Sequence, residues 1–138
     1  MSSEQNVMTI GRMVQSLFVE SDLEVLEEVF SEDYVRHATT GDIDRAGFRE
    51  ALQALHAGFP DLHNEVEVTV AADDKVAYKW TSTGTHLGVF LEVPPTHKRI
   101  FTTGITISRF DEAGAIVEDW ASWDGVSVLH SLGVIPVT

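Results

Sequence analysis

Apolar residues in the first 60 positions recur at the spacing of a helix, and three helices are expected there. In the first, Met13 lies beside an apolar stripe made of Val7, Ile10, Val14, Leu17 and Phe18. The segment Ser21-Asp22-Leu23-Glu24 has the pattern of a capping box and predicts a short second helix that buries Leu23, Leu26, Val29 and Phe30. A third helix is expected over residues 44–57, ended by Gly58 and Pro60, with an inward stripe of Phe48, Leu52 and Leu55.

After residue 61 the helical period gives way to alternation, which predicts strands. A half-buried strand is indicated by Val66, Val68 and Val70, and a turn by Asp73-Asp74. The next strand places one set of side chains on a common face: Val76, Tyr78, Trp80, Ser82, Gly84 and His86. A strand over residues 100–110 has its more apolar face at Phe101, Thr103, Ile105 and Ile107.

The last strand, residues 115–123, is apolar on both faces, and a short helix is expected over residues 126–132. Helices followed by consecutive strands predict one α+β domain over residues 1–138, with an antiparallel sheet. Because helices can cover only one face of this sheet, the other is expected to be buried in a homodimer.

The charge balance restricts the partners. With 22 acidic and 9 basic residues the formal net charge is -13, which repels phosphate backbones and anionic lipid and argues against nucleic acid and membranes as partners. The acidic residues are scattered, as on a solubilising surface, although adaptation to high salt gives the same pattern. Cysteine is absent, the first nine residues do not resemble a signal peptide, and no apolar run approaches the ~20 residues that span a bilayer, so a cytoplasmic location is expected.

Few residues offer chemistry. The sequence has no glycine-rich phosphate loop and no nucleophile elbow, and its six histidines lack ligand spacing, so no metal and no cofactor are expected. Asp124 lies between the apolar last strand and the final helix. It reads either as the N-cap of that helix or as a carboxylate at the end of an apolar pocket, suited to proton transfer.

The pocket itself is predicted from alternation. If the last strand has no bulge, Trp120 and Asp124 share a face, and the predicted lining is Phe59, Trp80, His86, Thr103 and Trp120. His86 is a pocket hydrogen-bond donor or a satisfied strand-end histidine. His37, just after the second helix, has a loop-bonding or a ligand-binding role.

Four segments carry a family resemblance: Phe59-Pro60-Asp61-Leu62, Thr83-Gly84-Thr85-His86-Leu87-Gly88, Val93-Pro94-Pro95-Thr96, and the ending Ile116-Val117-Glu118-Asp119-Trp120 with Asp124 and Leu132-Gly133. In order and spacing they resemble the SnoaL-like polyketide cyclases, within the group that shares the nuclear-transport-factor type of cone. The resemblance covers residues 7–133.

That resemblance implies a conical barrel, in which a curled antiparallel sheet wraps around the N-terminal helices and encloses a pocket, often in a homodimer through the sheet. It also implies a cofactor-free intramolecular aldol ring closure on a small, polyketide-like ligand, with Asp124 as the acid/base residue and His37 and His86 at polar pocket positions. His97 stands where the family commonly has glycine after Pro-Pro-Thr, so the loop conformation is expected to differ there.

Three functions follow from these residues. The first is a cyclase in which Asp124, desolvated by Trp120, Trp80 and Phe59, moves a proton beside a carbonyl while His86 or His37 binds the enolate oxygen. The second is an isomerase-like or epoxide-hydrolase-like enzyme, for which Tyr78 and Arg109 are the additional candidates. The third is a non-catalytic module that binds a small apolar ligand or a protein partner.

Overall fold

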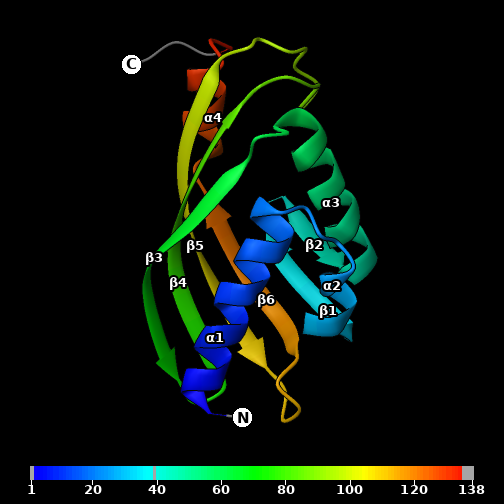
Figure 1. Cartoon of the computed structure of the whole chain (residues 1–138), viewed down its shortest axis with the longest axis vertical. Coiled ribbons are helices and arrows are strands. Elements are labelled where there is room, and N and C mark those ends of the chain that lie inside the picture. The colour runs from blue at the N-terminus through cyan, green and yellow to red at the C-terminus, as the bar shows by residue number, and fades with distance from the viewer. Residues whose placement is uncertain (1, 39, 135–138) are drawn as a thin grey trace.

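The computed structural model describes residues 2–38 and 40–134 of the chain (Figure 1). This part contains four α-helices, one π-helical segment and six strands. The helices are α1 (Ser3–Met13), which continues into η1 (Val14–Val19), α2 (Val25–Val29), α3 (Arg45–Gly58) and α4 (Gly125–Ser131). The strands are β1 (Phe30–Ala38), β2 (Gly41–Asp44), β3 (His63–Ala72), β4 (Lys75–Thr85), β5 (Arg99–Phe110) and β6 (Ile116–Trp123).

The strands form one curled sheet in the order β2-β1-β6-β5-β4-β3. Neighbours are antiparallel except β1 and β6, which are parallel. The predicted α+β cone is therefore confirmed, but the sheet is mixed and open where an antiparallel barrel was expected. The mixed direction arises from β1, which is parallel to β6. The sequence did not predict β1 and β2, because their mixed polarity gives no alternation that could have identified them as strands.

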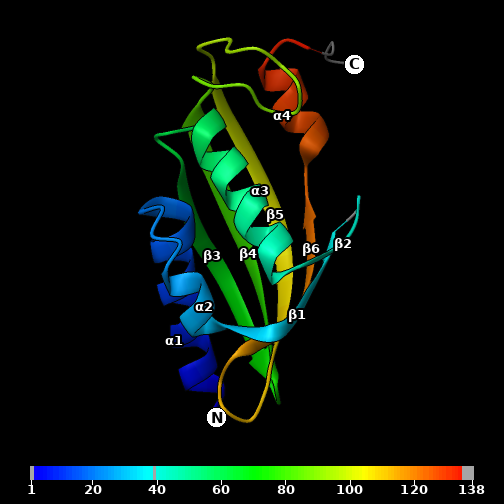
Figure 2. The ribbon, with the colours of Figure 1, turned by 90° about the vertical axis from the view of Figure 1, so that its right-hand side faces the viewer.

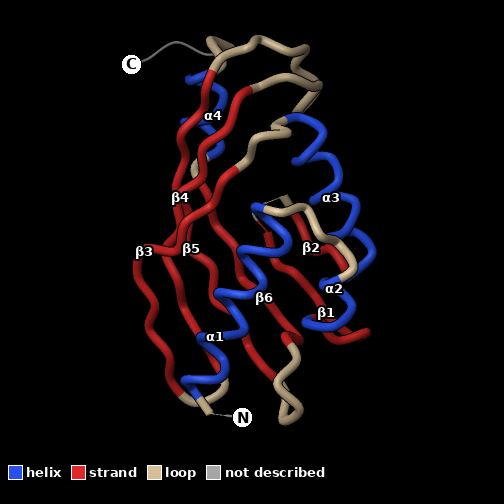
Figure 3. The backbone as a smooth tube through the Cα atoms, viewed as in Figure 1, coloured by secondary structure: helices blue, strands red, loops and turns tan. Residues whose placement is uncertain are grey.

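The long helices lie on one face of the sheet (Figures 1 and 2). α1 packs on β3 and β4, and α3 on β1 and β2. Their buried stripes meet β1 in one core, where the rings of Phe30 and Tyr34 contact Phe48 of α3. A long loop of residues 86–98 connects β4 to β5 beside the end of α3 (Figure 3).

The predicted helix caps agree with the structure only in part. Asp44 caps α3 by accepting from the Gly47 N–H at 2.8 Å, close to the predicted start of this helix. A capping box does exist, but at Ser2 and Gln5, where it opens α1. The box predicted at Ser21 is wrong: Ser21 has φ 56° and α2 begins without a side-chain cap.

Two β-bulges decide which side chains face the helices. Between β3 and β4 the register shifts after Val66, which turns Val68 and Val70 to the outer face and corrects the predicted half-buried strand. Between β5 and β6 the register shifts at Phe110, leaving Val117 without a partner in β5. Beyond this second bulge, the inward positions of β6 are Asp119, Ala121 and Trp123.

The outer face of the sheet carries large exposed apolar side chains: Val68, Val70, Phe101, Ile105, Ile107 and Trp120. In residues 2–38 and 40–134, no helix combines the length and apolar character needed to cross a membrane.

Candidate functional site

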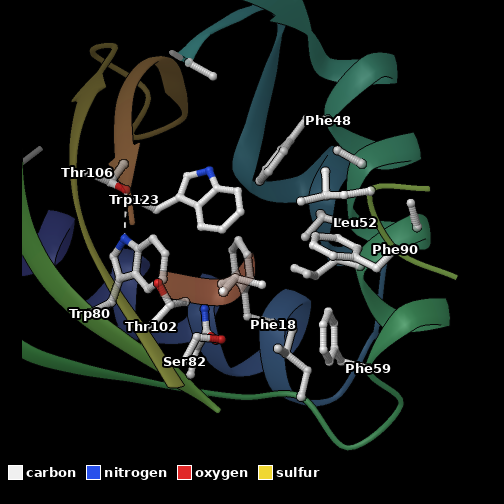
Figure 4. A pocket seen from close by; sticks show the side chains of 18 of the residues that line it. Phe18, Phe48, Leu52, Phe59, Trp80, Ser82, Phe90, Thr102, Thr106 and Trp123 are labelled. Atoms are coloured by element: carbon white, nitrogen blue, oxygen red, sulfur yellow. Dashed lines mark hydrogen bonds between the residues drawn. The ribbon is translucent and has the colours of Figure 1, made fainter. Parts of the chain in front are cut away.

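A cavity of about 430 Å³ lies between the inner face of the sheet, α3, η1 and the loop after β4 (Figure 4). The helical side of this cavity is apolar and mainly aromatic, with Phe18, Phe48, Leu52, Phe59 and Phe90 on its wall. Such a wall suits a flat apolar ligand, because aromatic side chains contribute large, rigid contact areas.

The sheet side of the cavity is lined with polar groups from the inward positions of β3, β4 and β5: Asn64, Tyr78, Ser82, Thr102 and Thr106. Two indoles lie among them. Trp80 donates from Nε1 to the Thr106 hydroxyl at 3.1 Å, and Trp123 projects from the end of β6 (Figure 4). Gly104 pairs with both tryptophans, and a side chain there would collide with the Trp80 indole.

One charged pair lies at this wall. Arg36 of β1 lines the cavity, and its Nη1 lies 3.1 Å from Oδ2 of Asp119, whose side chain is fully buried. Tyr34 donates its hydroxyl to the same oxygen at 2.6 Å, and the hydroxyl of Ser108 donates to Oδ1. The guanidinium also lies 4.5 Å from the centre of the Phe48 ring. These contacts fix Arg36 in place at the cavity wall.

The surroundings shift the protonation of this cluster. Burial raises the pKa of Asp119, and Arg36 with the hydrogen bonds from Ser108 and Tyr34 opposes that rise. Burial and the neighbouring Asp119 raise the pKa of Tyr34 and that of Tyr78 well above the usual range of a phenol. Both phenols are therefore neutral hydrogen-bond donors at physiological pH, and Arg36 brings the positive charge.

The chain is similar to known proteins in sequence and in fold. The sequence matches the family model "SnoaL-like polyketide cyclase" over residues 8–132. The chain belongs to the SnoaL-like polyketide cyclase family. The resemblance inferred from the four segments is thus confirmed. No curated protein matches the chain.

Solved structures of similar fold include two from Streptomyces. IdmH of Streptomyces antibioticus, a candidate polyketide cyclase, is 35% identical with a TM-score of 0.83, covering 94% of this chain and 99% of its own. AclR of Streptomyces galilaeus, a candidate hydroxylase, is 28% identical with a TM-score of 0.91, covering 99% and 86%. A SnoaL-like protein of Jannaschia sp. CCS1 shares the fold at 22% identity, with a TM-score of 0.88 over 97% and 95%.

Of the predicted pocket residues, Phe59 and Trp80 line the cavity. Trp120 and Thr103 do not: Trp120 pairs with Ile107 and Thr103 with Thr81, all on the outer face. The prediction that they share a pocket with Trp80 is wrong, because the bulge at Val117 reverses the faces of β6 and the apolar face of β5 points outward.

The two predicted histidines also lie away from the lining. His86 is fully buried behind Phe59, 5.5 Å between ring centres, and its Nδ1 accepts from the Thr96 backbone N–H at 3.2 Å. His37 lies beside Trp120 and within 2.6 Å of Glu118 and 2.9 Å of Asp42. Glu118, and then Asp42, raise the pKa of His37. His86 therefore holds the loop after β4, and His37 belongs to an ion-pair cluster outside the cavity.

Asp124 occupies the N-cap of α4. Its exposed side chain accepts from the Ser127 N–H at 2.9 Å, and its carbonyl accepts from the Thr102 hydroxyl at 2.9 Å. This geometry matches the cap interpretation, and Asp124 is outside the lining of the cavity. Its catalytic role stays a prediction.

The loop of residues 86–98 covers one end of the cavity with Val89, Phe90 and Leu91. It is anchored at Gly88, whose N–H donates to the Gly58 carbonyl at 3.1 Å and where a side chain would collide with the backbone of Ala57. His97 has φ 60°, a left-handed conformation that favours glycine. The backbone at His97 is thus of the type that glycine adopts, although the side chain differs.

The remaining candidates are divided between the two faces. Tyr78 lines the cavity, whereas Arg109 lies on the outer face and donates to Glu118 at 3.0 Å. In the described part of the chain, no group of three or more acidic, histidine or cysteine side chains could hold a metal ion.

Sequence reasoning missed three residues of the cavity wall and its support: Arg36, Asp119 and Asn64. The one signal for Asp119 was its place in a strand that is apolar on both faces.

Proposed function

We propose that this protein binds a flat, oxygenated aromatic molecule of the polyketide type and closes a ring in it by aldol chemistry. The observation that carries the proposal is the placement of Arg36. Among the described residues that line the cavity it is the one charged side chain, held by Asp119 near Tyr78 in otherwise uncharged surroundings. A fixed cation in such surroundings stabilises developing negative charge more strongly than water does.

Aldol addition within one molecule is an isomerisation. A C–H bond and the π bond of a carbonyl are replaced by a C–C bond and an O–H bond. In an enolised 1,3-dicarbonyl compound the methylene proton already lies on oxygen and can pass to the newly formed alkoxide, so no proton is left over. Loss of water, made from the new hydroxyl and one ring hydrogen, then gives the unsaturated ring. This sequence requires no cofactor.

We assign roles to the cavity residues accordingly. Arg36 stabilises the enolate and alkoxide oxygens, with Tyr78 as a neutral donor beside it. Trp80, Trp123, Phe48 and Phe59 hold the ring system so that the reacting carbons meet. Asp124 is the acid/base candidate that the family resemblance adds. Its exposed side chain caps α4 and is outside the lining of the cavity. The variant Asp124→Asn, which can still cap the helix, tests whether the carboxylate also transfers a proton.

A second function is favoured by one observation: no aspartate, glutamate or histidine is among the described lining residues. A module that binds the same ligand class without turning it over fits this lining. The two functions differ in turnover, not in binding.

The test uses an aromatic ester bearing a linear 1,3-dicarbonyl side chain. Mass spectrometry follows formation of a cyclic isomer and of its dehydration product. The variant Arg36→Met/Asp119→Asn removes the charge pair together, and Arg109→Met/Glu118→Gln removes the outer-face pair as a matched control. We expect a loss of roughly 10²–10³-fold in rate for the first variant and no loss for the control. Binding without turnover by the wild type would instead identify a binding module.

A further inference from the structure

Asn64 is a polar side chain of the cavity wall that has no role in the proposed chemistry. It is 9% exposed, it lines the cavity, and its Oδ1 is buried without a hydrogen-bond partner. An unpaired buried acceptor is unfavourable in the empty protein. A ligand group that donates a hydrogen bond would remove that deficit.

The neighbours of Asn64 point to the same kind of ligand group. Asn64 pairs with Ser82 across β3 and β4, and Ser82 pairs with Thr102 across β4 and β5, so the three side chains form one row on the inner face. All three line the cavity. The Thr102 hydroxyl already donates its proton to the Asp124 carbonyl, which leaves its oxygen as an acceptor. Two members of the row therefore carry an acceptor oxygen that is not fully used within the protein.

This row lies at a distance from the charged end of the cavity. Tyr78 and Ser82 are on the same face of β4, four residues apart, which corresponds to roughly 13 Å along a strand. Trp80 lies between them. The cavity thus has Arg36 and Tyr78 at one end, an aromatic middle, and at the other end the row of Asn64, Ser82 and Thr102, in which Asn64 and Thr102 have acceptor oxygens that are not fully used.

We propose that Asn64 is a specificity-determining residue that selects ligands carrying a hydroxyl donor at the end of the ring system remote from Arg36. This inference rests on the proposed function, because it takes the ligand to be a flat aromatic molecule. Carbonyl oxygens face Arg36, and a phenolic or alcoholic hydroxyl donates to Asn64 Oδ1.

The experiment uses three flat aromatic ketones that differ only at the end remote from the carbonyl: 4-hydroxychalcone, 4-methoxychalcone and chalcone. Binding is followed by quenching of tryptophan fluorescence and by calorimetry. For the wild type we expect the hydroxy probe to bind roughly tenfold more tightly than its methyl ether. For Asn64→Leu, which keeps the number of side-chain heavy atoms, we expect this preference to vanish while chalcone binds at least as tightly as before.

Two controls accompany the variant. Thr81→Val, on the outer face, should keep the tenfold preference. Thermal unfolding of Asn64→Leu should show no loss of stability, since an unpaired polar group is removed, and Asn64→Val serves if leucine does not fit. A tenfold preference retained in the Asn64 variants overturns the assignment while leaving the ligand class intact. Failure of all three probes to bind the wild type overturns the ligand class and this inference with it.

Discussion

Arg36 Nη1 lies 3.1 Å from Asp119 Oδ2, although the two residues are 83 positions apart in the sequence. Arg36 comes from β1 and Asp119 from β6, and the parallel pairing of these strands brings Arg36 directly beside Asp119. A buried charge without its partner is far more costly than a buried pair.

The first prediction concerns the stability of this pair. Arg36→Met alone leaves the Asp119 carboxylate buried and unpaired, so we expect the free energy of unfolding to fall by about 3–5 kcal/mol. Adding Asp119→Asn should restore most of the loss, because the amide is neutral and can still accept from Tyr34. Urea unfolding measures both effects. Arg109→Met, in the partly exposed pair with Glu118, should cost about 1 kcal/mol or less. Equal losses at the two arginines would contradict the prediction.

Asp124 provides the second prediction. Asparagine caps helices as well as aspartate does, so Asp124→Asn should unfold at the temperature of the wild type, whereas Asp124→Ala should lose about 1 kcal/mol. If the resemblance assigns the acid/base role correctly, Asp124→Asn also lowers turnover by roughly a hundredfold. Unchanged turnover in Asp124→Asn would leave the residue with the cap alone.

The third prediction follows from the backbone of His97. A left-handed conformation costs a residue with a Cβ about 1–2 kcal/mol, and glycine avoids this cost. Glycine also has greater conformational freedom in the unfolded chain, which offsets part of the stabilisation. We therefore expect His97→Gly to raise the free energy of unfolding by roughly 0.5–1 kcal/mol. His97→Ala keeps the Cβ and should give no such gain. A stabilising alanine would show that the imidazole, not the backbone, is responsible.

The fourth prediction is a pH dependence. Glu118 and Asp42 raise the pKa of His37 above its ordinary value near 6.5, so its imidazolium is bound more firmly in the folded state. The stabilisation is fully present below about pH 6.5 and is lost as the pH rises through the folded pKa. Proton NMR of His37 gives that pKa. Glu118→Gln should lower it, and an unchanged titration would exclude Glu118 as the main cause.

The fifth prediction concerns the outer face of the sheet. Phe101 and Ile105 are more than half exposed there, and Ile107 and Trp120 lie beside them, so we expect two copies of the chain to bury this face against each other. Sedimentation should show a dimer at high micromolar concentration, and Ile105→Glu should abolish it. Met8→Glu, at an exposed apolar position of α1, serves as the control. A monomeric wild type would contradict the prediction.

The sequence alone determined much of this protein. Strict alternation identified β4 and its inward face from Val76 to His86, and the turn at Asp73-Asp74. The helical period located α3 to within a residue at each end, and four short segments identified the family. These features are local: each depends on neighbouring side chains, on a cap or on a turn.

Tertiary structure decided the composition of the site. A bulge adds one residue to a strand and reverses every face beyond it, and sequence alternation does not reveal where the bulge lies. The bulge at Val117 turned Asp119 and Trp123 inward and Trp120 outward. Arg36 reached the cavity through the pairing of β1 with β6, strands far apart in the chain. Local periodicity therefore predicted the elements, whereas register and strand pairing selected the side chains that meet.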